Sequence, residues 1–178
     1  MKKSVIYGLL LFFLLVACKG KNKEQYEKAK AEKEIAETES LLYETEEPNA
    51  ELAKKIIGLY VAYADKYVDS ENTPKYLFKA SEIAMNFNQP NNSIRYLTRI
   101  EENYPKFDKY PEVIFLKAFV YENYLKQLDK AEFYYKKFLE EYPDHKLAES
   151  AKSALMFLGM TDEQLIELFT EMNRYNKK

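Results

Sequence analysis

The chain has 178 residues, which suits one domain plus a targeting segment and gives enough apolar content for a substantial core. Few Gly (4), few Pro (6) and many Tyr (16) and Phe (11) favour an all-α fold over one built from short strands and turns. The formal net charge of −2 argues against nucleic acid as a partner, because phosphate binding needs a clustered basic surface.

Residues 1 to 17 predict a secretory signal peptide. Lys2 and Lys3 precede an apolar run, residues 5 to 17, that is too short to span a bilayer comfortably. The run ends in Leu-Val-Ala-Cys, which resembles the bacterial lipobox and contains the only cysteine, Cys18. The resemblance implies cleavage before Cys18 and acylation of its thiol and amine, and two or three acyl chains would anchor the chain durably. The alternative, an ordinary signal-peptide residue without lipid, stays open.

Residues 18 to 23 are predicted to be the lipidated cysteine and a short tether, followed by a charged helix over residues 24 to 47. Six Lys and four Glu occur in residues 19 to 34, whereas residues 35 to 51 hold six Glu and no base. The lysines could lie on anionic lipid or be solvated, and both readings stay open. The helix should dock only in its second half, where it has its apolar bulk, at Ile35, Leu41, Leu42 and Tyr43.

Residues 48 to 178 are predicted to form one helical domain. Apolar residues recur at helical spacing over residues 50 to 68, 74 to 88, 111 to 127 and 129 to 142, and in a further helix that follows residues 89 to 92 and ends at Tyr104. The loops between them are short, which predicts antiparallel hairpins.

Several residues mark the ends of these helices. Thr73 is expected to be an N-cap before Pro74, and Pro143-Asp144 is expected to start a helix that stops at Gly159, a residue that suits a left-handed helix end. Thr161 to Gln164 matches a capping box. The last helix, residues 162 to 175, carries an apolar stripe of Leu165, Leu168, Phe169 and Met172.

The stretch from Pro111 to Pro143 recurs upstream at an offset of 38 residues. Glu140-Glu141-Tyr142-Pro143 echoes Glu102-Asn103-Tyr104-Pro105, and the same offset pairs Ala118 with Ala80, Lys117 with Lys79, Tyr134 with Tyr96 and Phe138 with Ile100. A fixed period of this size is typical of stacked two-helix repeats. We expect the helices at residues 50 to 68 and 162 to 175 to cap a short solenoid.

The small and aromatic positions at Ala118, Tyr121, Ala131 and Tyr135, followed by Pro143, resemble the tetratricopeptide repeat. The period of 38, the lysine at 117 and Ile114 in place of Trp depart from it. The chain resembles the small repeat lipoproteins of Bacteroidetes and, more distantly, the barrel-assembly lipoprotein and the Tol-Pal repeat protein. This implies an all-α, short tetratricopeptide-like solenoid of antiparallel hairpins behind a lipoprotein signal peptide.

In the resembled fold, the first helix of each pair lines a concave groove. The resemblance therefore implies that a partner would contact the inward positions Leu77, Ser81, Ala84, Met85, Phe115, Phe119, Glu122 and Asn123. The helix carries more aromatic residues than one core-facing side requires, Phe119 above all, so one interpretation is a groove that binds a peptide or helix. Packing of Phe119 against the neighbouring helix is the other, and both stay open.

No constellation for catalysis is found in the sequence. The single histidine, His145, is expected at the surface, without a cysteine to share a metal or a nucleophilic role. No glycine-rich loop could hold phosphates, and the pairs Glu101-Glu102 and Glu140-Glu141 are interpreted as solvated helix faces. We expect no catalytic residue, no cofactor and no metal.

The leading hypothesis is a non-catalytic, membrane-anchored scaffold that binds another envelope protein or peptide, in outer-membrane assembly or maintenance. The alternative is a structural lipoprotein that self-associates or spaces the envelope without a peptide ligand. An enzyme is a third hypothesis, which would need a metal or cofactor. Lys19 differs from the Asp that retains lipoproteins at the inner membrane of enteric bacteria, and the following run lacks an acidic cluster. We therefore predict anchoring to the outer membrane on its periplasmic face.

Overall fold

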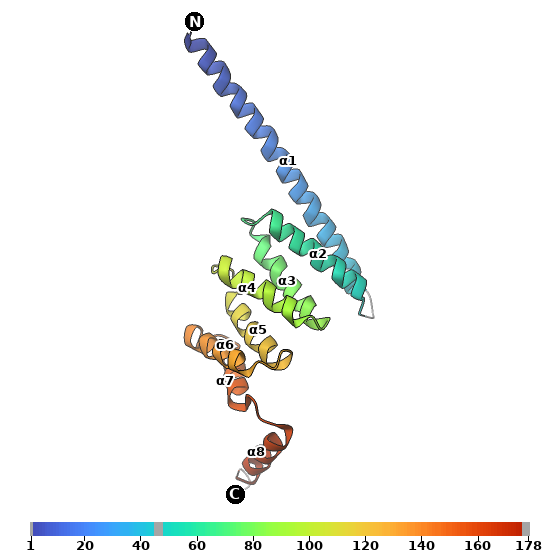
Figure 1. Ribbon diagram of the computed structural model, residues 1–178, viewed down its shortest axis with the longest axis vertical. Helices are drawn as coiled ribbons and strands as arrows, with labels where there is room; N and C mark the ends of the chain where they lie inside the picture. Colours follow the sequence, from blue (N-terminus) through green and yellow to red (C-terminus); the bar gives the residue numbers. More distant parts are fainter. Residues whose placement is uncertain (1, 45–47, 176–178) are drawn as a thin grey trace. The chain divides into compact units, whose positions relative to one another are not determined.

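The computed structural model describes the backbone of residues 2 to 44 and 48 to 175, and the side chains of residues 22 to 44, 48 to 161, 163 to 172 and 174. All regular structure in these ranges is helical, as predicted (Figure 1). The chain divides into two compact units, Met1–Tyr76 and Leu77–Lys178.

The first unit is built on two helices, α1 (Lys2–Glu44) and α2 (Ala50–Lys66). Helix α1 includes residues 19 to 23, so the segment expected to be a tether is helical, and its role as a tether stays a prediction. The chain breaks at Pro48, and Asn49 caps α2 by accepting a hydrogen bond from the amide of Leu52 at 3.0 Å. Cys18 and the predicted signal peptide lie outside the described side chains.

Helix α1 packs against α2, and its buried or half-buried residues run from Glu27 to Leu42, so docking is not confined to the second half of the predicted helix over residues 24 to 47. Ile35 and Thr38 are buried, whereas Leu41 and Tyr43 are exposed, which corrects their expected role in docking. The tyrosines of α2 explain the difference. The hydroxyl of Tyr60 donates to Glu39, and that of Tyr63 donates to Glu32, so carboxylates of α1 meet phenols of α2 along the contact. These charge-assisted hydrogen bonds supplement a thin apolar contact.

The next helices repeat with the period seen in the sequence. They are α3 (Asn72–Asn86), which crosses the boundary between the units, α4 (Pro90–Asn103), α5 (Tyr110–Asn123) and α6 (Leu128–Glu141). A shift of 38 residues carries the start of α3 to the start of α5, and both ends of α4 to both ends of α6. The backbone therefore confirms the predicted repeat.

The turn between successive hairpins also repeats. Helices α2, α4 and α6 end at Tyr67, Tyr104 and Tyr142, and each tyrosine carbonyl accepts a hydrogen bond from the amide three residues later. The residue that donates this amide then accepts, through its own carbonyl, a hydrogen bond from the amide three residues further along the chain. The three pairs of backbone hydrogen bonds measure 2.8 to 3.2 Å and involve Ser70 and Thr73, Phe107 and Tyr110, and His145 and Ala148. The same backbone hydrogen bonds therefore connect successive hairpins, although the residues that follow each tyrosine differ.

This joint between successive hairpins corrects two expected helix starts. Helix α7 (Ala148–Phe157) was expected to start at Pro143-Asp144 but begins at Ala148, 38 residues after the start of α5 at Tyr110. Residues 143 to 147 form the turn that precedes it. Thr73 lies inside the first turn of α3 and is not its N-cap. Its buried hydroxyl donates to the carbonyl of Tyr67, while the amide of Asn72 is satisfied by the Ser70 hydroxyl at 3.3 Å.

The loops inside the hairpins repeat as well. Asn88 and Lys126, one period apart, have positive φ values of 56° and 53° and end α3 and α5 in left-handed conformations. A helix end of this kind usually carries Gly or Asn, and Gly159 fills the same role after α7 with φ 78°, as predicted. Lys126 therefore occupies a left-handed conformation that glycine or asparagine would adopt more easily.

The core of the second unit lies between α5, α6 and α7, which pack in sequence. Its buried members are Ile114, Ala118, Tyr121, Ala131, Tyr135, Phe138, Ala148 and Ala151, and the helical spacing predicts all of them except Ala148. Small residues face large ones across the helices, and Tyr121 stacks on Tyr134 with ring centroids 5.7 Å apart. The aromatic rings fill space that the alanines leave open.

The last helix, α8 (Asp162–Tyr175), does not cap this core. Its predicted capping box is confirmed, because the amide of Thr161 donates to the Gln164 side chain at 2.9 Å and the amide of Gln164 donates to the Thr161 hydroxyl at 3.3 Å. Yet none of its described side chains is buried, and Phe169 and Met172 are exposed. The expectation of a C-terminal cap is therefore wrong: the turn at Gly159 leads α8 away from a packed position.

Candidate functional site

The residues expected to line a groove fall into three groups. The first comprises Leu77, Ser81 and Ala84 of α3, which are fully buried. The Ser81 hydroxyl is satisfied by the carbonyl of Phe78 at 2.6 Å. A partner could touch these side chains only after displacing the residues that cover them.

The second group packs into the fold while keeping some exposure. Met85 and Phe115 are half-buried. The ring of Phe115 contacts those of Tyr135 and Phe138 at centroid distances of 5.7 and 5.6 Å in edge-to-face geometry. Phe115 therefore belongs to the margin of the core, and its apolar area is mostly used there.

The third group comprises Phe119, Glu122 and Asn123. Together with Tyr124, which the sequence did not suggest, these residues form an accessible surface at the C-terminal end of α5, which we call the α5 surface. The half-buried ring of Phe119 lies against that of Tyr124 at 6.2 Å, on the same helix end. Asn123 is exposed, and its amide donates to the Phe119 carbonyl at 3.0 Å. An aromatic pair beside an exposed amide offers both apolar and hydrogen-bonding contacts to a partner.

Glu122 is held by the core beneath this surface. Its carboxylate accepts hydrogen bonds from the buried phenol of Tyr135 at 2.7 Å and from Asn123 at 3.4 Å. Burial, together with the adjacent carboxylate, raises the pKa of Tyr135, so the phenol stays protonated and keeps donating. Glu122 is thus oriented for recognition and also satisfies a buried hydroxyl. No pattern in the sequence indicated this link between α5 and α6.

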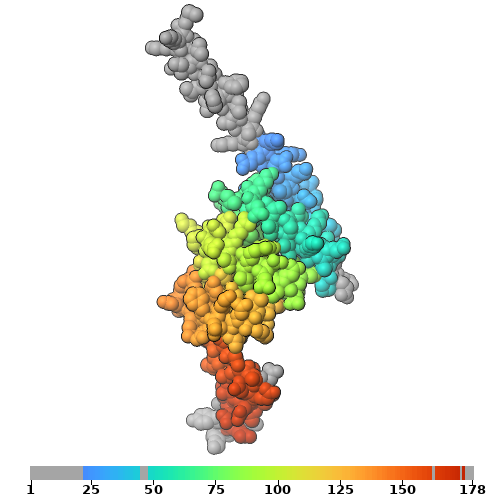
Figure 2. Space-filling model, viewed as in Figure 1, coloured from blue at the N-terminus to red at the C-terminus, as the bar shows by residue number. Residues whose placement is uncertain are grey.

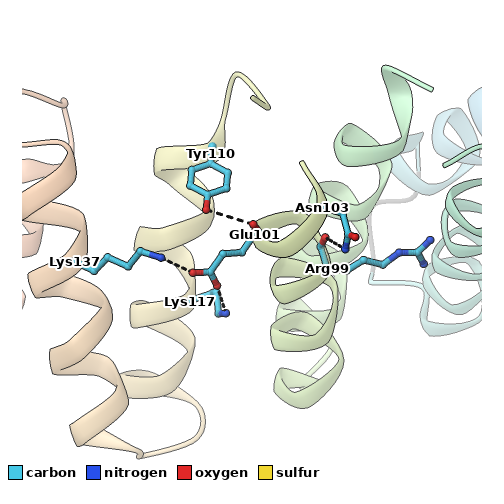
Figure 3. Close-up of polar contacts among 6 residues, drawn as sticks. All are labelled: Arg99, Glu101, Asn103, Tyr110, Lys117 and Lys137. Atoms are coloured by element: carbon cyan, nitrogen blue, oxygen red, sulfur yellow. Dashed lines mark hydrogen bonds and ion pairs between the residues drawn. The ribbon is translucent and has the colours of Figure 1, made fainter. Parts of the chain in front are cut away.

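A charged cluster joins α4, α5 and α6 (Figure 3). We use this name for Glu101, Lys117 and Lys137. One carboxylate oxygen of Glu101 lies 2.5 Å from Nζ of Lys117, and the other lies 2.6 Å from Nζ of Lys137. The side chains are 17% exposed for Glu101, 2% for Lys117 and 24% for Lys137. Glu101 is therefore no part of a solvated helix face, whereas Glu102, Glu140 and Glu141 are exposed, as expected.

The cluster explains why a lysine occupies position 117, where the repeat pattern has an apolar residue. Its ammonium lies 4.5 Å from the ring centroid of Tyr134 as well as against Glu101. Burial alone would lower the pKa of Lys117, but the hydrogen bonds and charges of Glu101 and Tyr134 together outweigh burial and raise the pKa. Likewise, burial pushes the pKa of Glu101 up, and the two lysines outweigh it and hold the pKa below its usual range. All three groups are therefore charged at neutral pH.

His145 is less exposed than expected. Its ring packs edge to face on Phe138 at 5.5 Å, and Nδ1 accepts a hydrogen bond from the amide of Leu147 at 3.2 Å. Its Nε2 lies 3.7 Å from Glu112. These contacts stabilise the turn before α7. Across the described side chains, no cluster of three or more His, Cys, Asp or Glu that could hold a metal is found.

The first unit contains a cavity of about 290 Å³ between α1 and α2. The residues that line it include Ile35, Leu59, Tyr63, Lys30 and Lys66. No helix is long and apolar enough to cross a membrane in the part of the chain whose side chains are described.

The α5 and α6 hairpin carries both the α5 surface and most of the charged cluster. Residues 112 to 145 match the tetratricopeptide repeat family model. The match begins in the first turn of α5 and ends in the joint that precedes α7. A comparison with curated proteins gave no significant match.

The tetratricopeptide match confirms the repeat that the sequence predicts for this hairpin. Together with the equal helix bounds one period upstream, it shows an all-α helical-repeat fold. Tetratricopeptide repeats generally mediate contacts between proteins and present binding surfaces on their helices rather than catalytic groups. The α5 surface lies within the matched repeat and is accessible, which makes it the candidate site for a protein partner.

Proposed function

We propose that this chain is a non-catalytic scaffold that binds another envelope protein or peptide through the α5 surface. The observation that carries the proposal is the tetratricopeptide match on the hairpin that bears this surface. The exposed amide of Asn123 and the ring pair of Phe119 and Tyr124 are suited to contact an extended peptide or one face of a helix. The buried Leu77 and Ser81 are not part of the proposed contact.

The proposal includes attachment to a bacterial membrane through lipid on Cys18. Its support is the sequence of residues 1 to 18, with a basic start, an apolar run and a lipobox-like end. The outer membrane and its periplasmic face are the proposed location, and envelope assembly or maintenance is the proposed process. Resemblance to the repeat lipoproteins of Bacteroidetes supports this part.

Binding is tested by affinity purification of the full chain from detergent-solubilised native membranes. The double variant Phe119→Ala and Asn123→Ala should reduce recovery of a specific partner by about tenfold or more, since a few anchoring residues dominate most interfaces. Glu122 is left intact, because its loss would also leave the buried Tyr135 hydroxyl without its partner.

The matched control is Phe133→Ala on α6, a ring that is 60% exposed and lies outside the α5 surface. It should leave recovery unchanged. Equal recovery with the wild-type chain, the control and the double variant would show that the α5 surface does not bind the partner.

Anchoring is tested separately by metabolic labelling with a fatty-acid analogue. The wild-type chain should incorporate label and Cys18→Ser should not. Fractionation with added proteinase then places the protein: protection in intact cells and cleavage after the outer membrane is permeabilised support the periplasmic face. Label on the Cys18→Ser chain would contradict lipidation at this residue.

A further inference from the structure

Helix α8 presents an apolar face that the described chain leaves largely uncovered. Phe169 is 47% exposed, Met172 and Ile166 are exposed, and Leu165 and Leu168 are only half-buried. The Phe169 ring contacts that of Phe157 on α7, with centroids 5.6 Å apart. Figure 2 shows α7 and α8 in red, and on the visible face no other segment covers α8.

A helix of this length needs a packing partner. Isolated helices shorter than about 12 to 15 residues are marginal in water, because most helical stability in proteins comes from packing of the apolar face. Helix α8 has 14 residues. The apolar surface also continues past the turn, where Met156 and Met160 are exposed.

The distribution of charge along α8 indicates what the partner is. Four acidic residues occur between 162 and 171, while the chain from 174 onward carries three basic residues, Arg174, Lys177 and Lys178. Two such helices side by side in parallel would place like charges together. In an antiparallel pair, the acidic part of each helix would face the basic end of the other.

We infer that α8 is a self-association element, in which the apolar faces of α8 from two copies of this chain pack in antiparallel orientation. Phe169, at the middle of the stripe, is buried in the pair, and Met172 and Leu165 flank it. The dipoles of two antiparallel helices also oppose each other favourably. The inference is independent of the α5 surface, so a chain that self-associates can still bind a partner there.

The first test measures the mass of the full chain in detergent by analytical ultracentrifugation over a concentration series. The wild type should reach a dimer, and Phe169→Glu should raise the dimer Kd by about tenfold or more, because it places a charge where an apolar ring is buried. Phe133→Glu is the control: its ring is also exposed and also has a ring neighbour, Tyr134, at 5.1 Å. It should dimerise as the wild type does. All variants share residues 1 to 21, so association through that segment would be common to them.

The second test reads orientation and does not depend on a disruptive substitution. Two chains, Glu163→Cys and Arg174→Cys, are each prepared with Cys18→Ser, given different affinity tags, mixed and oxidised. Antiparallel packing predicts that mixed 163 to 174 disulfides exceed 163 to 163 and 174 to 174 disulfides. A monomeric wild type, a dimer insensitive to Phe169→Glu, or a preference for disulfides between like positions would each overturn the inference.

Discussion

The charged cluster offers the sharpest test of how this fold is stabilised. Glu101→Gln keeps the shape of the side chain and removes the carboxylate that Lys117 and Lys137 both contact. Lys137 is 24% exposed and can turn to water, but Lys117 is 2% exposed and cannot. Removing one partner of a buried ion pair costs about 3 to 5 kcal/mol, because the remaining charge is uncompensated. The ring of Tyr134 still faces Lys117, so we expect the lower end, about 3 kcal/mol.

The two lysines should behave differently from the glutamate. Lys117→Met leaves Glu101 paired with Lys137 and places an apolar side chain in a buried space, so the cost should be about 1 kcal/mol or less. Lys137→Met removes the more exposed partner and should cost about 0 to 1 kcal/mol. The double variant Glu101→Gln with Lys117→Met removes the buried charge together with its partner. It should recover at least about half of the loss caused by Glu101→Gln alone.

The assay is urea denaturation followed by circular dichroism, with hydrogen exchange at amides of α5 to assign the transition to the second unit. Changes in midpoint at a constant m-value report stability. A loss below about 1 kcal/mol for Glu101→Gln, against the buried-pair range, would refute the reasoning. So would a double variant that is no more stable than Glu101→Gln, because the buried ammonium would then not be the source of the loss.

Three further predictions concern the end of α5, the docking of α1 and the pH dependence of stability. Lys126→Gly should stabilise the chain by up to about 1 kcal/mol in urea denaturation, because it removes the steric strain of a side chain at φ 53°. The control, Lys106→Gly, lies in a turn without positive φ and should not stabilise the chain. Tyr63→Phe removes the hydrogen bond to Glu32 and should speed amide exchange in residues 27 to 44 of α1 by about tenfold, while Tyr26→Phe, at an exposed position, should leave it unchanged. The pKa of Glu101 lies below its ordinary value of 4.5, so the stability it contributes is present above that value and is lost as the pH falls below it; Glu101→Gln should show a weaker loss of stability between about pH 5 and pH 3 than the wild type.

Local patterns in the sequence were sufficient for most helices and for the repeat. Helical spacing of apolar residues identified the core between α5 and α6, and the offset of 38 identified the period. Such features depend on neighbours within one or two turns of a helix. Glycine at 159 and the capping box at Thr161 are equally local, and both were predicted correctly.

Contacts between distant residues were the part that the sequence could not provide. Glu101 and Lys137 lie 36 residues apart, and only the stacking of α4, α5 and α6 brings them together around Lys117. The polar contacts that dock α1 were missed for a related reason. An apolar count favours Leu41 and Tyr43, whereas the contacts are made by Glu32 and Glu39 with tyrosines of α2. Carboxylates on a helix otherwise indicate solvent exposure, so composition gave no signal.

The placement of α8 could not be predicted because amphipathicity specifies that a face must be covered and not what covers it. The stripe through Phe169 has the same spacing as stripes that pack inside the fold. The candidate site was predicted in part. The end of α5 is accessible as expected at Asn123, but Leu77 and Ser81 are buried, because the inward positions of α3 are used for packing.

The joint between hairpins bears on how such a chain can grow. Because Tyr67, Tyr104 and Tyr142 each accept the same backbone hydrogen bond, and the next amide three residues on completes the turn, the connection depends little on which side chains follow. A copy of residues 105 to 142 inserted after Tyr142 would meet an identical connection at both of its ends. The number of hairpins is therefore free to change by duplication of a 38-residue segment, without a new kind of turn having to arise.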